Sequence, residues 1–181
     1  MTDLRVVRGG RVCLGRGRER LLGVYREVYA DVLREPFFSE SRYWQRLEGY
    51  AERNGFALVV GDVDGELVGY ALGCTLPAQA RWWNGLVDPV DAGLLAEDGR
   101  RTFALNEIMV RAAWRRRGFA RALHDALLAG RPEQRATLLV DPANGPARAA
   151  YLSWGWYAFG RVKPFPDSAT FEALMLDLTR G

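Results

Sequence analysis

The chain has 181 residues and a formal net charge of +3 at pH 7, and 49% of its residues are hydrophobic and 12% aromatic. This composition supports a sizeable core and excludes a disordered chain, and no stretch approaches the roughly 18 consecutive apolar residues of a membrane-spanning helix. Its two cysteines, Cys13 and Cys74, are too few for a disulfide framework. Because the N-terminal residues also lack the apolar core of a signal peptide, we expect a cytoplasmic protein.

The first part of the chain predicts a strand, two helices and a hairpin, in that order. Residues 4–7 are followed by two glycines, which favours a strand and a turn. Apolar residues recur at helical spacing from about Arg18 to the residues before Pro36, and again from Ser39 or Ser41 to about residue 54. Strand-like runs at 56–60 and 67–72 are separated by a segment ending in Asp-Gly, which is typical of a hairpin turn.

The second part predicts a long excursion and then alternating strands and helices. The excursion covers residues 77–101 and contains Trp82 and Trp83, which are poor solvent-facing residues. The pattern beyond it predicts strands at 102–111 and 136–140, helices at 118–129 and 146–154, and late strands around 156–162 and 171–178. The expected order is therefore β-α-α-β-β-β-α-β-α-β-β.

Several familiar chemistries are excluded by missing residues. Lys163 is the only lysine, and no G-x-x-x-x-G-K-[ST] sequence occurs, so the chain is not a P-loop nucleotide triphosphatase. The single histidine, His124, cannot build an H-E-x-x-H zinc site. We therefore expect no metal in the reaction.

The turn before the helix at 118–129 favours an anionic ligand. It reads Arg115-Arg116-Arg117-Gly118-Phe119-Ala120. A glycine-bearing turn entering a helix exposes backbone N–H groups at the positive end of the helix dipole, and arginines there can contact phosphate oxygens. These features indicate a polyphosphate or pyrophosphate site, and the alternative is an ordinary connection with a solvated basic run.

Charge is distributed unevenly along the chain. Residues 108–148 hold eight arginines and three acidic residues, whereas residues 56–107 hold eight acidic residues and three arginines. This division favours one anionic and one cationic ligand, as in a two-substrate enzyme. The alternative is that both sets of charges line solvated faces.

Two segments together resemble a known family. The segment Leu105-x-Glu107-x-x-Val110-x-x-x-x-Arg115-x-x-Gly118-x-Ala120-x-x-Leu123 resembles the acyl-CoA-binding motif Q/R-x-x-G-x-G/A of the GNAT superfamily of N-acyltransferases. The segment Asn144-x-x-Ala147-x-x-x-Tyr151-x-x-x-Gly155-Trp156 resembles the family's second motif, N-x-x-A-x-x-x-Y-x-x-x-G-F, with tryptophan in place of the final phenylalanine. The resemblance covers most of the chain in element order and about residues 103–162 in recognisable residues.

The resemblance implies a fold and indicates which segments of the chain bind each substrate. It implies one α/β domain of the α+β type over residues 1–181, with a mixed, mostly antiparallel sheet of six to seven strands flanked by about four helices. Acceptor-side elements are expected at about 18–101 and an acetyl-CoA-binding core at about 102–162.

The resemblance also implies which residues contact the co-substrate, acetyl-CoA. The backbone of the turn at 115–120 would hold the coenzyme A pyrophosphate, and the strand end at Ile108, Met109 and Val110 would pair with the pantetheine arm. Asn144 and Ala147 would lie on the pantetheine side, and Tyr151 near the thioester sulfur.

The mechanism follows from the chemistry of an amine acceptor. Glu107 is the candidate base that takes the proton of the amine, directly or through water, and the alternative is that it forms a salt bridge with a nearby arginine. Tyr151 is the candidate acid for the leaving thiolate, with a reference pKa of about 10, and the alternative is a buried aromatic residue. We expect direct transfer in a ternary complex rather than an acyl-cysteine intermediate.

The acceptor is expected to be a primary amine of a small molecule. Phe38, Trp82 and Trp83 would line its site with Glu107, because aromatic rings and carboxylates suit an organic cation. The tryptophans could instead pack in the core, and the acceptor could be a peptide or protein amine, or the chain a non-catalytic acyl-CoA sensor. We expect no nucleic-acid or membrane partner, and a monomer or homodimer.

Overall fold

The structure is a computed structural model, and it describes residues 3–178. The chain divides into two compact units, one formed by Met1–Cys74 and Leu105–Gly130, the other by Thr75–Ala104 and Arg131–Gly181. Strand β4 (Thr102–Val110) gives its first three residues to the second unit and the others to the first.

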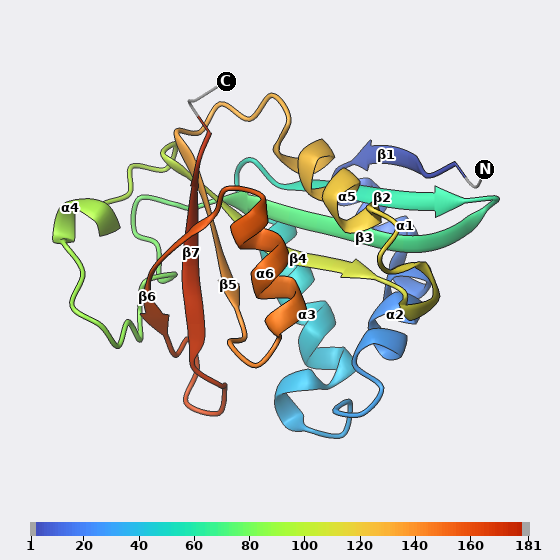
Figure 1. Ribbon diagram of the computed structural model, residues 1–181, viewed down its shortest axis with the longest axis horizontal. Helices are drawn as coiled ribbons and strands as arrows, with labels where there is room; N and C mark the ends of the chain where they lie inside the picture. Colours follow the sequence, from blue (N-terminus) through green and yellow to red (C-terminus); the bar gives the residue numbers. More distant parts are fainter. Residues whose placement is uncertain (1–2, 179–181) are drawn as a thin grey trace. The chain divides into compact units, whose positions relative to one another are not determined.

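The sheet of the first unit is antiparallel in its first three strands, β1 (Arg5–Gly9), β2 (Ala57–Val63) and β3 (Glu66–Thr75) (Figure 1). The β2–β3 hairpin closes over Asp64 and Gly65, whose φ angles are 51° and 87°. Left-handed conformations at both central residues define the turn that Asp-Gly favours, so the predicted hairpin is confirmed.

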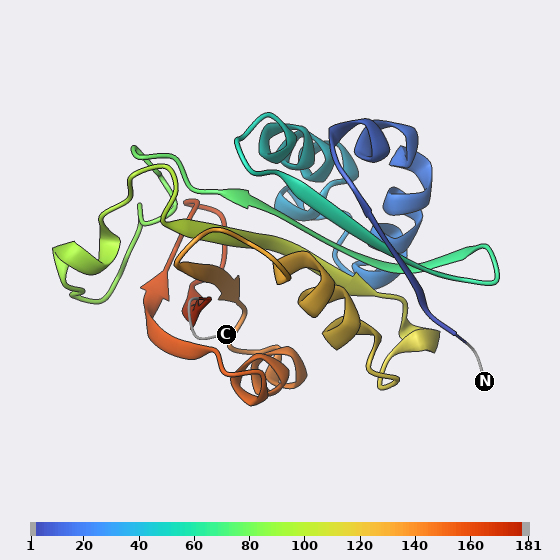
Figure 2. The same ribbon diagram turned by 90° about the horizontal axis from the view of Figure 1, so that it is seen from above.

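Helices cover both faces of these strands (Figure 2). One face carries α1 (Arg11–Arg16), α2 (Arg18–Val28) and α3 (Glu40–Ala51), and the other carries α5 (Phe119–Leu128). The predicted helices after Ser39 and at 118–129 are confirmed. The helix predicted from about Arg18 to the residues before Pro36 is present but ends at Val28, and residues 29–34 form turns instead. The short helix α1 was not predicted. Two single turns complete this unit, η1 (Pro36–Phe38) and η2 (Ala112–Trp114).

The core of the first unit lies between the sheet and helices α1–α3. Its fully buried side chains include the leucines of α2 and three tyrosines from α2, α3 and β3: Leu21, Leu22, Tyr25, Tyr43, Leu47, Leu58, Tyr70 and Leu72. Tyrosines in such a core need hydrogen-bond partners for their hydroxyl groups. The helices that bury them therefore also bring polar groups close to β4.

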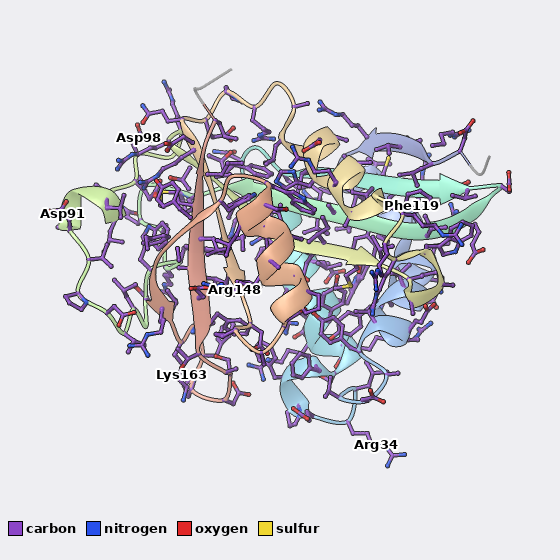
Figure 3. All side chains as sticks on the ribbon, in the orientation of Figure 1. Arg34, Asp91, Asp98, Phe119, Arg148 and Lys163 are labelled. Carbon is purple, nitrogen blue, oxygen red and sulfur yellow. The ribbon has the colours of Figure 1, made fainter. Side chains whose placement is uncertain are left out.

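The second unit contains the start of β4, β5 (Arg135–Val140), β6 (Tyr157–Val162) and β7 (Phe171–Asp177). β4 and β5 pair in parallel, whereas β7 lies antiparallel between β5 and β6. Helix α6 (Gly145–Ser153) follows β5, and Arg148 on it, labelled in Figure 3, forms a hydrogen-bonded ion pair with Glu172 of β7 at 2.5 Å. The strands follow the order β1-β2-β3-β4-β5-β7-β6, a mixed sheet of seven strands, as predicted.

The excursion at 77–101 folds back within the second unit. It contains a one-turn helix, α4 (Ala92–Leu95), which was not predicted. Trp83 packs edge-on against Phe159, with ring centroids 5.4 Å apart. The buried side chain of Arg135 donates hydrogen bonds to the carbonyl of Leu94 at 2.6 Å and to Glu97 at 3.0 Å, which ties the excursion to β5.

Six α-helices are present in the described residues, against about four expected. The two additional helices are short, and their sequences carry no extended helical period. None of the helices within residues 3–178 is long and apolar enough to cross a membrane. The expected division between acceptor-side elements and a coenzyme-binding core stays a prediction.

Candidate active site

Glu107 lies on β4 in the first unit and keeps part of its surface open to solvent. Among residues 3–178, no side chain or backbone group forms a hydrogen bond or ion pair with its carboxylate, so the salt bridge considered as its alternative role is not seen. Burial raises the pKa of Glu107 to about 7, and the positive charge of Arg46 opposes this rise without cancelling it. A carboxyl group with a pKa near 7 can accept and release a proton at neutral pH, as a general base must.

Four tyrosines lie in the electrostatic field of this carboxylate. They come from three elements: Tyr25 from α2, Tyr43 and Tyr50 from α3, and Tyr70 from β3. Burial is the main reason why the pKa of each phenol is raised, and the negative charge of Glu107 raises it further. All four therefore stay protonated at neutral pH and add no negative charge near Glu107.

The tyrosines also fix one another. The hydroxyl groups of Tyr43 and Tyr70 lie 2.6 Å apart, and the hydroxyl of Tyr70 donates a further hydrogen bond to the sulfur of Met109 at 3.5 Å. The ring of Tyr25 stacks on that of Tyr43 with centroids 3.7 Å apart, and its hydroxyl donates to the carbonyl of Phe38 at 2.8 Å. Helices α2 and α3 thus hold an ordered aromatic layer beside β4.

Arg46 is the cation of this region. It lies on α3, and its guanidinium donates to the carbonyl of Phe37 at 3.1 Å and lies over the rings of Phe37 and Tyr43, at 4.9 and 5.6 Å from their centroids. No carboxylate within the described part of the chain lies at ion-pair distance from it. Its charge nevertheless acts on Glu107, and the two residues therefore form a separated pair of opposite charges.

The end of β4 is packed tightly against β3. Met109 and Val110 are buried and Ile108 is half-buried. A Cβ atom at Gly69 of β3 would lie 2.4 Å from the carbonyl oxygen of Met109, so only glycine permits this approach of the two backbones. These three residues of β4, expected to pair with pantetheine, are thus held by their own neighbouring strand.

The loop after β4 has the backbone of an anion site. Arg116 and Gly118 have left-handed φ angles of 61° and 79°, and Gly118 is the N-cap residue of α5. In the described structure, the backbone N–H groups from Arg116 to Ala120 make no hydrogen bond to the protein. Successive unpaired N–H groups at a helix N-terminus favour a bound anion, as the sequence predicted for this turn.

Side chains stiffen this loop from within. Arg115 donates to the carbonyl of Val110 at 3.1 Å, and the guanidinium of Arg117 lies 4.9 Å from the ring centroid of Trp114. Trp114 in turn stacks on Phe119, which Figure 3 labels on the first turn of α5, with centroids 5.9 Å apart. The arginines are exposed, so they remain free to meet an anion.

The start of the loop is fixed by a residue of α2. The carboxylate of Glu27 accepts hydrogen bonds from the guanidinium of Arg111 at 2.6 Å and from the backbone N–H of Ala112 at 2.9 Å. Arg111 also donates to the carbonyl of Leu67 on β3 at 2.8 Å. Burial disfavours the charge of Glu27, but the hydrogen bonds from Arg111 and Ala112 outweigh it and lower the pKa of Glu27.

Asn144, Ala147 and Tyr151 belong to α6 and its cap, in the second unit. Asn144 is the N-cap residue, and its side chain accepts a hydrogen bond from the N–H of Ala147 at 3.3 Å. Tyr151 is 7% exposed, and its ring contacts Trp154 and Trp156 edge-on, with centroid distances of 5.5 and 6.0 Å. These contacts fit both the expected catalytic role and the alternative of a buried aromatic residue.

The aromatic residues expected at the acceptor site fall in different units. Phe38 lies in the first unit, where its ring stacks on Tyr29 with centroids 5.3 Å apart. Trp82 and Trp83 lie in the second unit and pack in its hydrophobic cluster, and neither buried indole N–H has an acceptor among the described residues. The packing alternative for the tryptophans is thus seen in the structure, and their contact with an acceptor stays a prediction.

Sequence reasoning missed Arg46 and Glu27. Arg46 follows Tyr43 by one helical turn, so the apolar period of the helix placed it beside the core, but nothing nearby indicated its relation to Glu107. No local pattern marks Glu27, because its hydrogen-bond partners, Arg111 and Ala112, lie 84 and 85 residues further along the chain. Within residues 3–178, no group of three or more His, Cys, Asp and Glu side chains is arranged to hold a metal ion.

A sequence model of the acetyltransferase (GNAT) family matches residues 25–156, which is more than half of the chain. The chain therefore belongs to the acetyltransferase (GNAT) family. The matched range includes Glu107, the loop after β4 and Tyr151. No curated protein sequence gives a significant match.

Solved structures of acetyltransferases share the fold. The ribosomal-protein-S18-alanine N-acetyltransferase from Escherichia coli is 16% identical, with a TM-score of 0.64 over 99% of this chain and 96% of that one. The diaminobutyrate acetyltransferase from Paenibacillus lautus, in complex with L-2,4-diaminobutyric acid and coenzyme A, is 15% identical, with a TM-score of 0.62 over 98% and 96%. An N-acetyltransferase from Thermoplasma acidophilum, in complex with coenzyme A, is 10% identical, with a TM-score of 0.62 over 97% and 99%. Identities at this level show a common fold.

Proposed function

We propose that the protein transfers an acetyl group from acetyl-CoA to a primary amine of a small molecule, by direct attack in a ternary complex. The observation that carries this proposal is the state of Glu107, a carboxyl group without an ion-pair partner among the described residues and with its pKa raised to about 7. An alkylammonium group must lose a proton before it can attack a thioester, and a base of this pKa accepts that proton at neutral pH. Membership of the acetyltransferase (GNAT) family supports the same reaction.

The loop at 115–120 has features that support acetyl-CoA as the co-substrate. Its unpaired backbone N–H groups and exposed arginines fit the pyrophosphate of coenzyme A, because both favour phosphate oxygens at a helix N-terminus. We propose that the end of β4 holds the pantetheine arm and that Asn144 and Ala147 contact it from α6. No metal takes part in this scheme.

The proposed reaction needs a base for the amine and an acid for the thiolate, and we propose Glu107 and Tyr151 for these roles. Glu107 accepts a proton from the ammonium group, and the amine nitrogen then forms its bond to the thioester carbon. The nitrogen releases its second proton to solvent as the carbon–sulfur bond breaks. Tyr151 would give its hydroxyl proton to the departing thiolate and recover a proton from solvent. The products are the acetylated amine and free coenzyme A.

Thiol release tests the proposal. Purified protein, acetyl-CoA and a panel of small primary amines would be mixed and free coenzyme A measured, first with wild type and then with Tyr151→Phe. We expect one class of amines to stimulate release, and Tyr151→Phe to lower turnover about 10- to 100-fold with acetyl-CoA affinity nearly unchanged. Binding of acetyl-CoA without release for any small amine would contradict the proposal and favour a peptide or protein acceptor, or a sensor.

A further inference from the structure

Arg46 has no anionic partner among the described residues, unlike Arg26 and Arg111. On the adjacent helix, Arg26 forms ion pairs with Glu40 and Glu19, and at the end of β4 Arg111 pairs with Glu27. Arg46 has no such partner within residues 3–178, although it is only partly exposed. Partial burial of a guanidinium without a carboxylate costs desolvation free energy, so a bound anion would stabilise Arg46.

The protein holds Arg46 away from the one carboxylate whose charge it influences. Its hydrogen bond to the carbonyl of Phe37 and its position over the rings of Phe37 and Tyr43 fix the guanidinium on α3. Glu107 projects from β4 and is not within ion-pair distance. The Glu107 carboxylate accepts no hydrogen bond in the described structure. The Arg46 guanidinium has five N–H donors and interacts with the carbonyl of Phe37 and the hydroxyl of Tyr25, so donors remain for an anion.

We propose that the acceptor amine is an amino acid or a close relative, whose carboxylate binds Arg46 while its ammonium group faces Glu107. A guanidinium binds a carboxylate through two parallel N–H···O bonds, and its fixed fork makes that contact selective. Arg46 lies over the buried ring of Tyr43, whose hydroxyl lies 2.6 Å from that of Tyr70. Tyr70 in turn donates to the sulfur of Met109, which shares one face of β4 with Glu107. This inference rests on the proposed function, because it assigns the substrate class of the same site.

The inference predicts a preference that matched acceptors can measure. Amino acids with a free α-amino or side-chain amine would be compared with their carboxamides, which keep the amine and lose the negative charge. We expect wild type to acetylate the carboxylate form with kcat/KM about 10- to 100-fold higher than the amide, since a charge-assisted contact is lost.

Variants distinguish a direct contact of Arg46 with the carboxylate from a general effect of positive charge on α3. Arg46→Met should abolish the preference by lowering kcat/KM for the carboxylate form alone, and Arg46→Lys should retain part of it. Arg42→Met is the matched control, because Arg42 lies over the same Phe37 ring, 5.2 Å from its centroid, one turn earlier on α3. It should leave the preference intact, and circular dichroism would verify that each variant is folded.

The possible outcomes are distinct. Equal rates with acid and amide in wild type, or a preference that survives in Arg46→Met, would overturn the inference while leaving the acetyltransferase function in place. Acetyl-CoA binding with no acetylation of any amine would overturn the proposed function and this inference together. The wild-type comparison needs no variant, so it decides the matter even if Arg46→Met does not fold.

Discussion

Glu27 and Arg111 form a 2.6 Å ion pair that joins helix α2 to the end of β4. The second oxygen of the same carboxylate accepts the N–H of Ala112, where the loop toward α5 begins. One side chain therefore fixes Arg111 and Ala112, the two residues that follow β4. Because the loop at 115–120 is the proposed pyrophosphate site, Glu27 is a positioning residue for coenzyme A binding.

Glu27→Gln should weaken acetyl-CoA binding about 5- to 10-fold, because it removes the charge that orders the start of the loop. Calorimetric titration would measure the dissociation constant. Glu19→Gln is the control on the same helix: its side chain is 76% exposed, and its 3.3 Å ion pair with Arg26 is at the surface. Equal affinities for wild type and Glu27→Gln would contradict the role given to this contact.

Glu107 should control the pH dependence of turnover. Since burial raises its pKa to about 7 and the base works only when deprotonated, kcat/KM should rise with pH below about 7 and level off above it. Rates would be measured between about pH 5.5 and 9, with the ionisation of the amine taken into account.

Glu107→Gln should remove this limb of the profile and lower kcat about 100- to 1,000-fold, with acetyl-CoA affinity unchanged. Glu66→Gln, at an exposed position on β3, should behave as wild type. A Glu107→Gln profile that still bends near pH 7 would assign the base to another group.

Removing one hydroxyl of the Tyr43–Tyr70 pair should lower the free energy of unfolding by more than the hydrogen bond itself contributes, because the other hydroxyl stays buried. Tyr43→Phe leaves the buried hydroxyl of Tyr70 with the sulfur of Met109 as its remaining partner among the described residues, so we expect a loss of about 1–2 kcal/mol in the free energy of unfolding. Urea denaturation of both single variants and of the double variant would test this. The double variant should lose less than the sum of the two single losses, and strict additivity would show that the hydroxyl groups act independently.

The pair of Arg135 and Glu97 should matter for stability. The two side chains are 6% and 1% exposed, so Glu97→Gln leaves a buried cation without its anion and should cost about 3 kcal/mol. Arg121→Gln breaks an exposed i,i+4 pair with Asp125 and should cost less than about 1 kcal/mol. A small effect of Glu97→Gln in denaturant unfolding would mean that the excursion at 77–101 does not depend on this anchor.

Local signals account for the parts of the fold that the sequence predicted. The Asp64-Gly65 turn and the apolar stripes of α2, α3 and α5 each depend on residues close together in the chain. Helix α4 was missed although Asp91 caps it through hydrogen bonds to Gly93 and Leu94, because one capped turn is too short to give a period. Its carbonyl at Leu94 is held by Arg135, a contact that no local pattern encodes.

In the candidate site too, features encoded by one continuous segment could be predicted, and features that depend on packing between elements could not. The glycine-bearing turn at 115–120 and the placement of Glu107 on β4 could be predicted, since both lie in one continuous segment. The tyrosine layer, Arg46 and Glu27 could not, because each acquires its relation to β4 only when α2 and α3 pack on the sheet. A raised pKa depends on this packing, so it is a property of the fold.

The most direct test of the central claim is calorimetric titration of wild type, Gly118→Ala and Gly118→Glu with acetyl-CoA. A Cβ at Gly118 would meet no atom within 4 Å, so Gly118→Ala adds only the strain of a left-handed φ of 79°, whereas Gly118→Glu also places a negative charge at the proposed pyrophosphate site. We predict binding by wild type, a modest loss for Gly118→Ala and a loss of more than about tenfold beyond it for Gly118→Glu. Absence of binding by wild type, or equal affinity for the two variants, would contradict the account.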